Sequence, residues 1–212
     1  MTECCLIFDL DGTLVDSELI NAQVLKSLFN DLSYEPYELA LTYRGWKLDK
    51  ILADIYKRDK LIANEESVAN YHSLVEQAFT ANLKAFEGVA QTLEKLSQRK
   101  CVASSAPLTK IKAALDVTGL SSFFGEHLFS SYIVGHWKPD PKLFLFAAQA
   151  MGVPAQKCIV IEDSQVGITA AKLAGMIPIQ FGSQIAYDTD TYYFSDYKDL
   201  PALIEGIVSN MH

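Results

Sequence analysis

The sequence lacks several features that would mark whole classes of protein. Its 212 residues carry 18 lysines and arginines against 26 aspartates and glutamates, and no run of basic residues occurs. This balance argues against a surface for nucleic acid or for anionic membrane lipids. The longest apolar stretches fall well short of the roughly 20 residues that cross a bilayer, and the basic segment that opens a secretory signal peptide is missing. We therefore expect a soluble cytoplasmic protein without a nucleic-acid or membrane partner.

The four cysteines show no spacing typical of a metal site or a redox motif. Cys4, Cys5, Cys101 and Cys158 all fall in or beside short apolar runs. No C-x-x-C pair occurs, and no cysteine stands at metal-ligand spacing from one of the four histidines. Reduced, buried thiols are the favoured interpretation, in agreement with a reducing compartment.

What the sequence does contain is an alternation of short apolar runs and helical segments. Apolar runs typical of buried parallel strands occupy residues 4–8, 100–103, 158–161 and 177–181. Helical periodicity occupies residues 89–98, 108–115, 142–151 and 166–174. This alternation predicts an α/β fold with a Rossmann-like, doubly wound parallel sheet.

One long segment interrupts the alternation directly after the first predicted strand. From about residue 17 to residue 85 the pattern is helical with short loops, and no convincing strand occurs. We interpret this segment as an all-helical domain inserted into the sheet domain. The predicted boundaries are residues 1–15 and 88–212 for the core and 16–87 for the insertion.

The first predicted strand ends in a cluster of carboxylates, in the stretch CLIFDLDGTLVDSE. Two carboxylates about 4 Å apart repel each other by roughly 4 kcal/mol at an effective dielectric constant near 20. Asp9 and Asp11 therefore need a cation nearby. In an open α/β sheet, ligands bind beyond the carboxyl ends of the strands, and other predicted strands end there in polar groups: Ser104, Ser105, Glu162 and Asp163.

These residue types suit phosphoryl transfer. Asp9 and Asp163 can hold Mg²⁺ through hard oxygen ligands, with Glu162 as a further ligand or orienting group. The ammonium of Lys138 and the hydroxyl and backbone amide of Ser104 and Ser105 can bind phosphate oxygens.

The two aspartates of the first cluster suit different steps of that reaction. Asp9 is the candidate nucleophile, because carboxylates form aspartyl-phosphate intermediates. Asp11 lies two residues further on an extended segment, so its side chain points the same way, and it can act as general acid and base.

At this point four stretches of the sequence resemble the motifs of the haloacid dehalogenase superfamily: DLDGTLVDSE, ASSAP, WKPDP and VIEDSQVGITAAKLAG. More narrowly, the chain is similar to the small-cap phosphatases related to β-phosphoglucomutase. The resemblance implies the same roles for Asp9, Asp11, Ser104 and Lys138. It also implies a Mg²⁺ site made by Asp9, the backbone carbonyl of Asp11, Glu162 and Asp163, and an insertion that closes over the site and selects a small phosphorylated substrate.

The resemblance also shows two departures from the mutases of this group. Asn21 stands where they carry a histidine, and Leu48 stands where they carry an arginine that holds a second phosphate. The loop retains Arg44, Trp46 and Lys47, which could hold an anionic, hydroxylated substrate, and with Asn21 these are the candidate substrate-binding residues. Together, WKPDP and RGWKL most resemble the 6-phosphogluconate phosphatases.

Three functions are therefore open. The favoured one is a Mg²⁺-dependent phosphatase of a sugar phosphate or sugar-acid phosphate, and the alternative is a sugar-phosphate mutase. A receiver-type signalling switch also gathers carboxylates, a hydroxyl and a lysine around Mg²⁺. It is disfavoured because such a domain phosphorylates an aspartate after a later strand and carries no insertion after its first strand.

Overall fold

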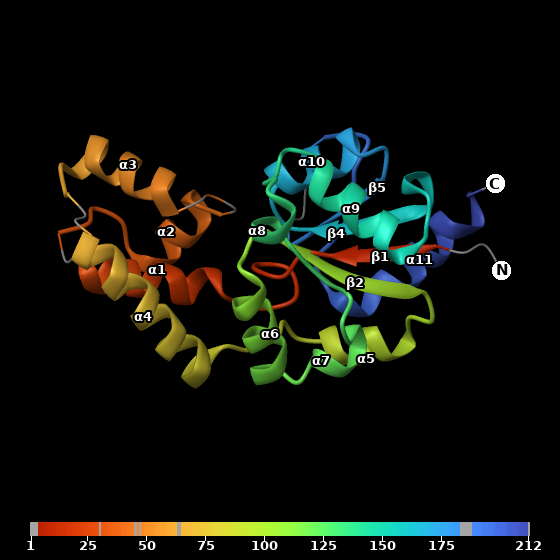
Figure 1. Cartoon of the computed structure of the whole chain (residues 1–212), viewed down its shortest axis with the longest axis horizontal. Coiled ribbons are helices and arrows are strands. Elements are labelled where there is room, and N and C mark those ends of the chain that lie inside the picture. Colours follow the sequence, from red (N-terminus) through yellow and green to blue (C-terminus); the bar gives the residue numbers. More distant parts are fainter. Residues whose placement is uncertain are drawn as a thin grey trace.

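A six-stranded sheet in which all neighbours are parallel forms the centre of the computed structural model (Figure 1). The structure describes residues 4–29, 31–44, 46, 48–62, 65–182 and 188–211. Across the sheet, the strands are β3 (Leu128–Ser130), β2 (Arg99–Ser104), β1 (Cys5–Phe8), β4 (Cys158–Glu162), β5 (Ile177–Phe181) and β6 (Tyr192–Phe194). The expected α/β fold with a doubly wound sheet is confirmed. The edge strands β3 and β6 were not predicted, because three residues are too few to show a periodic pattern.

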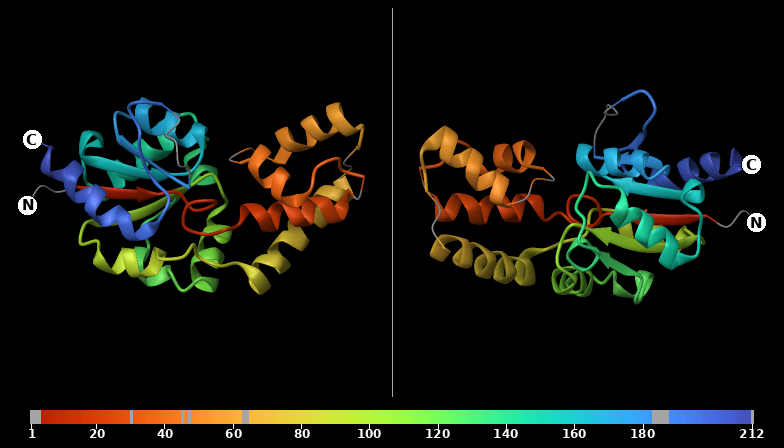
Figure 2. Two further views of the ribbon diagram at one scale, coloured as in Figure 1. Left: turned by 180° about the vertical axis from the view of Figure 1, so that it is seen from behind. Right: turned by 45° about the horizontal axis from the view of Figure 1, so that its top comes forward.

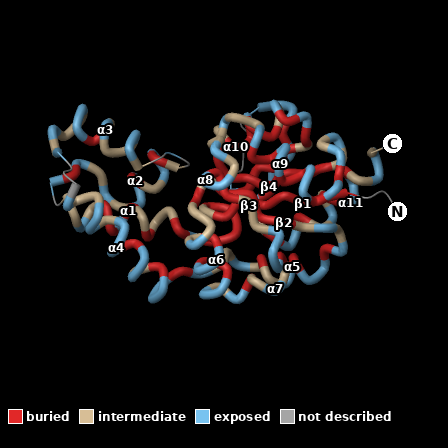
Figure 3. The backbone as a smooth tube through the Cα atoms, in the orientation of Figure 1, coloured by how far each residue is buried: buried red, intermediate tan, exposed pale blue. Residues whose placement is uncertain are grey.

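Helices cover both faces of the sheet, because successive strand residues point to opposite sides. On one face, Leu6 and Phe8 of β1 pack against the longer helices α5 (Val89–Lys95), α6 (Leu108–Val117) and α11 (Leu200–Ser209). On the other face, Cys5 and Ile7 pack against α9 (Lys142–Met151) and α10 (Gln165–Leu173). Short helical turns complete the core: α7 (Ser121–Phe124), α8 (Ser131–Val134), η1 (Ala155–Lys157) and η2 (Tyr197–Asp199). The buried centre of these layers is visible in Figure 3.

The helical insertion between β1 and β2 is also confirmed. It consists of α1 (Glu18–Leu28), α2 (Pro36–Thr42), α3 (Leu48–Asp59) and α4 (Glu65–Asn82). It has a small apolar cluster of its own, whose buried members are Ala22, Leu25, Leu32, Leu39, Tyr43 and Ile55. Figures 1 and 2 show that the insertion lies beyond the carboxyl ends of the strands.

Two linkers that run side by side join the insertion to the core. Val15 and Ala85 form an antiparallel bridge, the amide of Asp16 donates to the carbonyl of Lys84 at 3.0 Å, and the amide of Phe86 donates to the carbonyl of Leu14 at 3.1 Å. The chain therefore leaves and re-enters the core at one place. The division at residues 15/16 and 87/88 stays a prediction.

The structure also bears on the expectations drawn from composition. All four cysteines are buried, and none of them forms a disulfide. Within the described part of the chain, no helix has both the length and the apolar character that crossing a membrane requires.

Candidate active site

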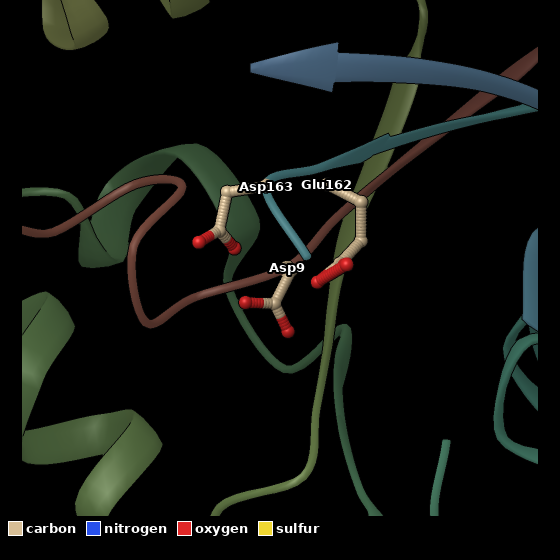
Figure 4. A group of neighbouring side chains, drawn as sticks. All are labelled: Asp9, Glu162 and Asp163. Atoms are coloured by element: carbon tan, nitrogen blue, oxygen red, sulfur yellow. The ribbon is translucent and has the colours of Figure 1, made fainter. Parts of the chain in front are cut away.

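Three carboxylates meet where β1 and β4 end side by side. Asp9 directly follows β1, Glu162 is the last residue of β4, and Asp163 follows it. Each offers an oxygen, and these oxygens all lie within 4.8 Å of one another, although the three residues are only 5%, 1% and 2% exposed. Figure 4 shows the three side chains turned toward a common space. The strand order changes direction between β1 and β4, which is where open α/β sheets place their ligand sites.

The ammonium of Lys138 lies inside this carboxylate group. Its Nζ donates to Oδ1 of Asp9 at 2.5 Å and to Oε1 of Glu162 at 3.3 Å, and its side chain is 4% exposed. A lysine so deeply buried is rare unless it is paired. The sequence-predicted meeting of Lys138 with the two acidic strand ends is therefore found in the structure.

Burial and the neighbouring charges shift the pKa values of Asp9, Asp163 and Lys138. Burial raises the pKa of Asp9 from 3.8 to about 7, with Lys138 opposing and Glu162 adding to the rise. Burial, together with the charges of Glu162 and Asp9, also raises the pKa of Asp163 well above its usual value. Burial alone would lower the pKa of Lys138, but Asp9 and Glu162 raise it above its ordinary value. One ammonium thus leaves the three carboxylates with an excess of negative charge.

Two glycines allow these carboxylates to lie so close to the backbone. Gly12 has a φ of +80°, and a Cβ there would lie 2.3 Å from Oδ2 of Asp163. A Cβ on Gly167, in the first turn of α10, would lie 1.7 Å from Oε2 of Glu162. The same Glu162 oxygen accepts hydrogen bonds from the amide and hydroxyl of Ser164 at 3.2 and 2.8 Å. Both glycines are needed for this close approach, and Gly12 also for its positive φ.

The donor set fits a hard divalent cation. Asp9, Glu162 and Asp163 supply carboxylate oxygens, which Mg²⁺ prefers, and they are close enough together to share one ion. The buried, mutually repelling carboxylates described above are what such an ion would neutralise. The additional ligand expected from the Asp11 backbone carbonyl stays a prediction.

Asp11 lies apart from the carboxylate triad, on the side of the insertion. Its Oδ1 accepts a hydrogen bond from the hydroxyl of Ser17 at 2.5 Å. Nζ of Lys110, on the first turn of α6, lies 2.9 Å from Oδ1 and 3.0 Å from Oδ2. The carboxylate is half-buried.

The two predicted phosphate-binding serines lie at the end of β2. Ser104 is the last residue of the strand and is buried, and its Oγ accepts a hydrogen bond from the amide of Ala106 at 3.1 Å. Ser105 follows in the turn before α6 and is half-buried. β2 is the other neighbour of β1, so both serines reach the same rim as Asp9.

Among the described residues of the insertion, Arg44 reaches the carboxylate group. Nε of Arg44, in the loop after α2, lies 3.2 Å from Oδ2 of Asp163. Trp46, in the same loop, is 47% exposed, and its ring packs on that of Tyr43 with centroids 5.6 Å apart. Asn21 is half-buried on α1. The predicted Lys47 lies outside the described residues.

Sequence reasoning missed several residues that hold the site together. The hydroxyl of Thr13 donates to Oδ1 of Asp163 at 3.1 Å, and the buried hydroxyl of Tyr197 donates to the carbonyl of Thr13 at 2.7 Å. Lys110 also belongs to this set. A signal for Lys110 existed, because the first turn of a helix that starts at the rim must lie near it. Tyr197 offered no such signal.

Comparison with known proteins agrees with this geometry. Residues 5–175 match the model of the haloacid dehalogenase-like hydrolases. The 6-phosphogluconate phosphatase of Escherichia coli is 34% identical over 175 residues, which cover 81% of this chain and 79% of that protein. The phosphorylated carbohydrates phosphatase of Thermotoga maritima is 27% identical over 184 residues, covering 81% of each chain.

A solved structure gives the same result for the fold. A haloacid dehalogenase-like protein of Agrobacterium tumefaciens superposes with a TM-score of 0.86 at 29% identity, over 97% of this chain and 99% of that one. The family resemblance expected from the four motifs is confirmed. The chain belongs to the haloacid dehalogenase-like hydrolases.

Proposed function

We propose that this protein is a Mg²⁺-dependent phosphatase that hydrolyses a sugar phosphate or sugar-acid phosphate through a phosphorylated Asp9. The observation that carries the proposal is the buried group of Asp9, Glu162 and Asp163 with the ammonium of Lys138 on Asp9. A buried carboxylate held at the rim of the sheet by a cation is suited to in-line attack on an anionic phosphate.

The reaction has two steps. In the first, an oxygen of Asp9 forms a bond to phosphorus while the bond from phosphorus to the ester oxygen breaks, and Asp11 gives its proton to that departing oxygen. In the second, Asp11 takes a proton from water as the water oxygen attacks phosphorus. The bond to Asp9 then breaks, and inorganic phosphate leaves.

The surrounding cations and donors reduce the charge that opposes the first step. Lys138 remains on Asp9 and can bind a phosphate oxygen, and the hydroxyl of Ser104 and the amide of Ser105 can bind others. Mg²⁺ held by Asp9, Glu162 and Asp163 would supply further charge neutralisation for the approach of two anions.

The insertion supplies the candidate substrate-binding residues. Arg44 reaches the carboxylate group from outside the core, so its guanidinium borders the space where the substrate body must lie. Trp46 offers an exposed ring on the same loop, and Lys47 and Asn21 complete the proposed set. Two cations and an aromatic ring suit a hydroxylated, anionic substrate. The names of the bacterial relatives agree with a phosphorylated sugar or sugar acid.

A mutase is the weaker candidate. A mutase must hold a second phosphate, yet Leu48 at the relevant loop position lines an apolar depression inside the insertion with Leu25, Phe29 and Leu52. Its side chain therefore serves packing, and Asn21 does not restore a cation. A receiver-type switch is disfavoured further, because Asp9 follows the first strand and the insertion comes after it.

The proposal is tested with a panel of sugar phosphates, sugar-acid phosphates and p-nitrophenyl phosphate, assayed with MgCl₂ and with excess EDTA. We expect one mole of inorganic phosphate per mole of substrate consumed, with activity lost in EDTA and restored by Mg²⁺. Isomerisation of a sugar phosphate that requires a bisphosphate activator would establish the mutase instead. Turnover that is indifferent to EDTA and Mg²⁺ would refute the metal-dependent mechanism.

A further inference from the structure

Lys110 holds the Asp11 carboxylate by both of its oxygens. The distances from Nζ to Oδ1 and Oδ2 are 2.9 and 3.0 Å, while the other partner, Ser17, reaches Oδ1 alone. A carboxylate held at one oxygen can still turn about its last side-chain bond. Contact with both oxygens restricts that rotation.

The same ammonium also contacts the insertion. Nζ of Lys110 lies 4.9 Å from the centre of the Phe79 ring, and Phe79 is a buried residue of α4, the helix that leads back to the core. Lys110 itself belongs to α6, which begins just after Ser104 and Ser105. One side chain, on the helix that follows the serine-bearing turn, therefore joins Asp11 to the insertion.

We propose that Lys110 is a positioning residue for the reaction. It holds the Asp11 carboxylate in the orientation from which Asp11 protonates the departing ester oxygen. This inference rests on the proposed function of Asp11. The competing explanation is an ordinary ion pair that merely stabilises the fold. The two side chains are partly buried, at 29% and 20% exposed, so loss of a purely structural pair would lower stability and affect all substrates alike, whereas small displacements of a catalytic acid lower the rate of the step that needs the acid.

The experiment compares substrates that differ in their need for an acid. An alkyl leaving group, as in a sugar phosphate, needs protonation as it departs, whereas p-nitrophenolate is stable without it. In Lys110→Met we expect kcat/KM for the sugar phosphate to fall by roughly tenfold or more, and for p-nitrophenyl phosphate by less than about threefold. Lys110→Arg, which can also bridge both oxygens, should restore most of the lost activity.

Lys112→Met is the matched control. Lys112 lies on the same helix, is half exposed, and faces Glu126 at 3.7 Å. It should leave both substrates unchanged. Equal losses on both substrates in Lys110→Met, or no loss on either, would overturn the proposal.

A double-mutant cycle separates positioning of Asp11 from direct binding of substrate. If Lys110 acts through Asp11, Lys110→Met should change kcat/KM by less than about twofold in an Asp11→Asn background. A loss as large as that seen in the wild-type background would overturn the proposal. If Asp11→Asn itself shows no preference for the aryl substrate, the assigned role of Asp11 fails. If the unaltered enzyme releases no phosphate from any ester, the proposed function fails.

Discussion

The rim of the sheet and the helical insertion differ in how far their ion-paired side chains are exposed. At the rim, the side chains of Asp9, Glu162 and Lys138 are 8% exposed or less. In the insertion, Arg58 pairs with Asp59 at 2.8 Å and with Asp54 at 3.7 Å, and the side chains of Arg58, Asp59 and Asp54 are 25%, 8% and 41% exposed. Buried charges are costly unless paired, whereas half-exposed pairs contribute little either way. The rim thus buries every member of its charged group, whereas the insertion leaves Arg58 and one of its two carboxylate partners partly exposed.

The largest expected effect lies at the rim. Asp9→Asn should lower phosphatase activity by about a thousandfold or more, because the amide is not a nucleophile. Its melting temperature should stay near that of the parent, since the substitution removes a buried negative charge without changing shape. Asp16→Asn is the matched control, because Asp16 lies on the same segment but is exposed, and it should keep full activity. An active Asp9→Asn enzyme would contradict the nucleophile assignment.

The second comparison concerns apolar packing. Ile161 in β4 and Ile55 in α3 are both buried, the first in the main core and the second in the small cluster of the insertion. Each change to alanine should cost about 2–5 kcal/mol of unfolding free energy, with Ile161→Ala at the upper end. Denaturant unfolding measures both. In Ile55→Ala the turnover of p-nitrophenyl phosphate should persist, and loss of that turnover would show that the two regions are less independent than their separate clusters suggest.

A smaller effect is expected from the residue that joins the two regions. If Arg44 contacts the substrate body as proposed, Arg44→Ala should raise KM for the best sugar phosphate by roughly tenfold and KM for p-nitrophenyl phosphate by less than about threefold. Lys50→Ala, which removes an exposed cation of α3, is the control and should change neither. Equal increases of KM on both substrates would argue against a recognition role for this loop.

The smallest expected effect is the change of the unfolding free energy with pH. The pKa of Asp9 is raised from 3.8 to about 7, so between about pH 4 and 7 the metal-free folded protein holds more protons than the unfolded chain. Its free energy of unfolding should therefore fall as the pH rises through this window. Mg²⁺ needs ionised carboxylates, so its stabilising effect should grow over the same range.

Thermal denaturation checks this expectation. The rise in melting temperature on adding MgCl₂ should be a few degrees at about pH 8 and smaller at about pH 5.5. Asp9→Asn is the control and should show a smaller rise at the higher pH. A rise that is the same at both pH values would contradict the buried, proton-holding state of the carboxylates.

The core and its charged rim could be predicted from the sequence for a geometric reason. Parallel strands end at one edge, so the residues at the ends of β1, β2 and β4 share one rim. Asp9 and Asp163 meet there, and Ser104 ends the neighbouring strand β2. The helical insertion was equally clear, because a long segment without strand periodicity cannot join the sheet.

The supporting contacts could not be predicted, because they depend on packing between distant segments. Tyr197 reaches the carbonyl of Thr13 across 184 positions of the chain, and Lys110 reaches Asp11 across 99. Tyr197 carries no local pattern that differs from that of an ordinary core tyrosine. The start of α6 at the rim places Lys110 near the site, but nothing in the sequence pairs it with Asp11. In the same way, loop composition alone could offer Arg44 and Trp46 as candidates but could not show that Arg44 reaches Asp163.

The paired linkers at Val15 and Ala85 have a consequence for how such proteins diversify. A module whose entrance and exit are adjacent can be lengthened, shortened or exchanged without re-threading the strands that it interrupts. The strands that carry Asp9, Glu162 and Asp163 can thus stay unchanged while the helical module between β1 and β2 varies.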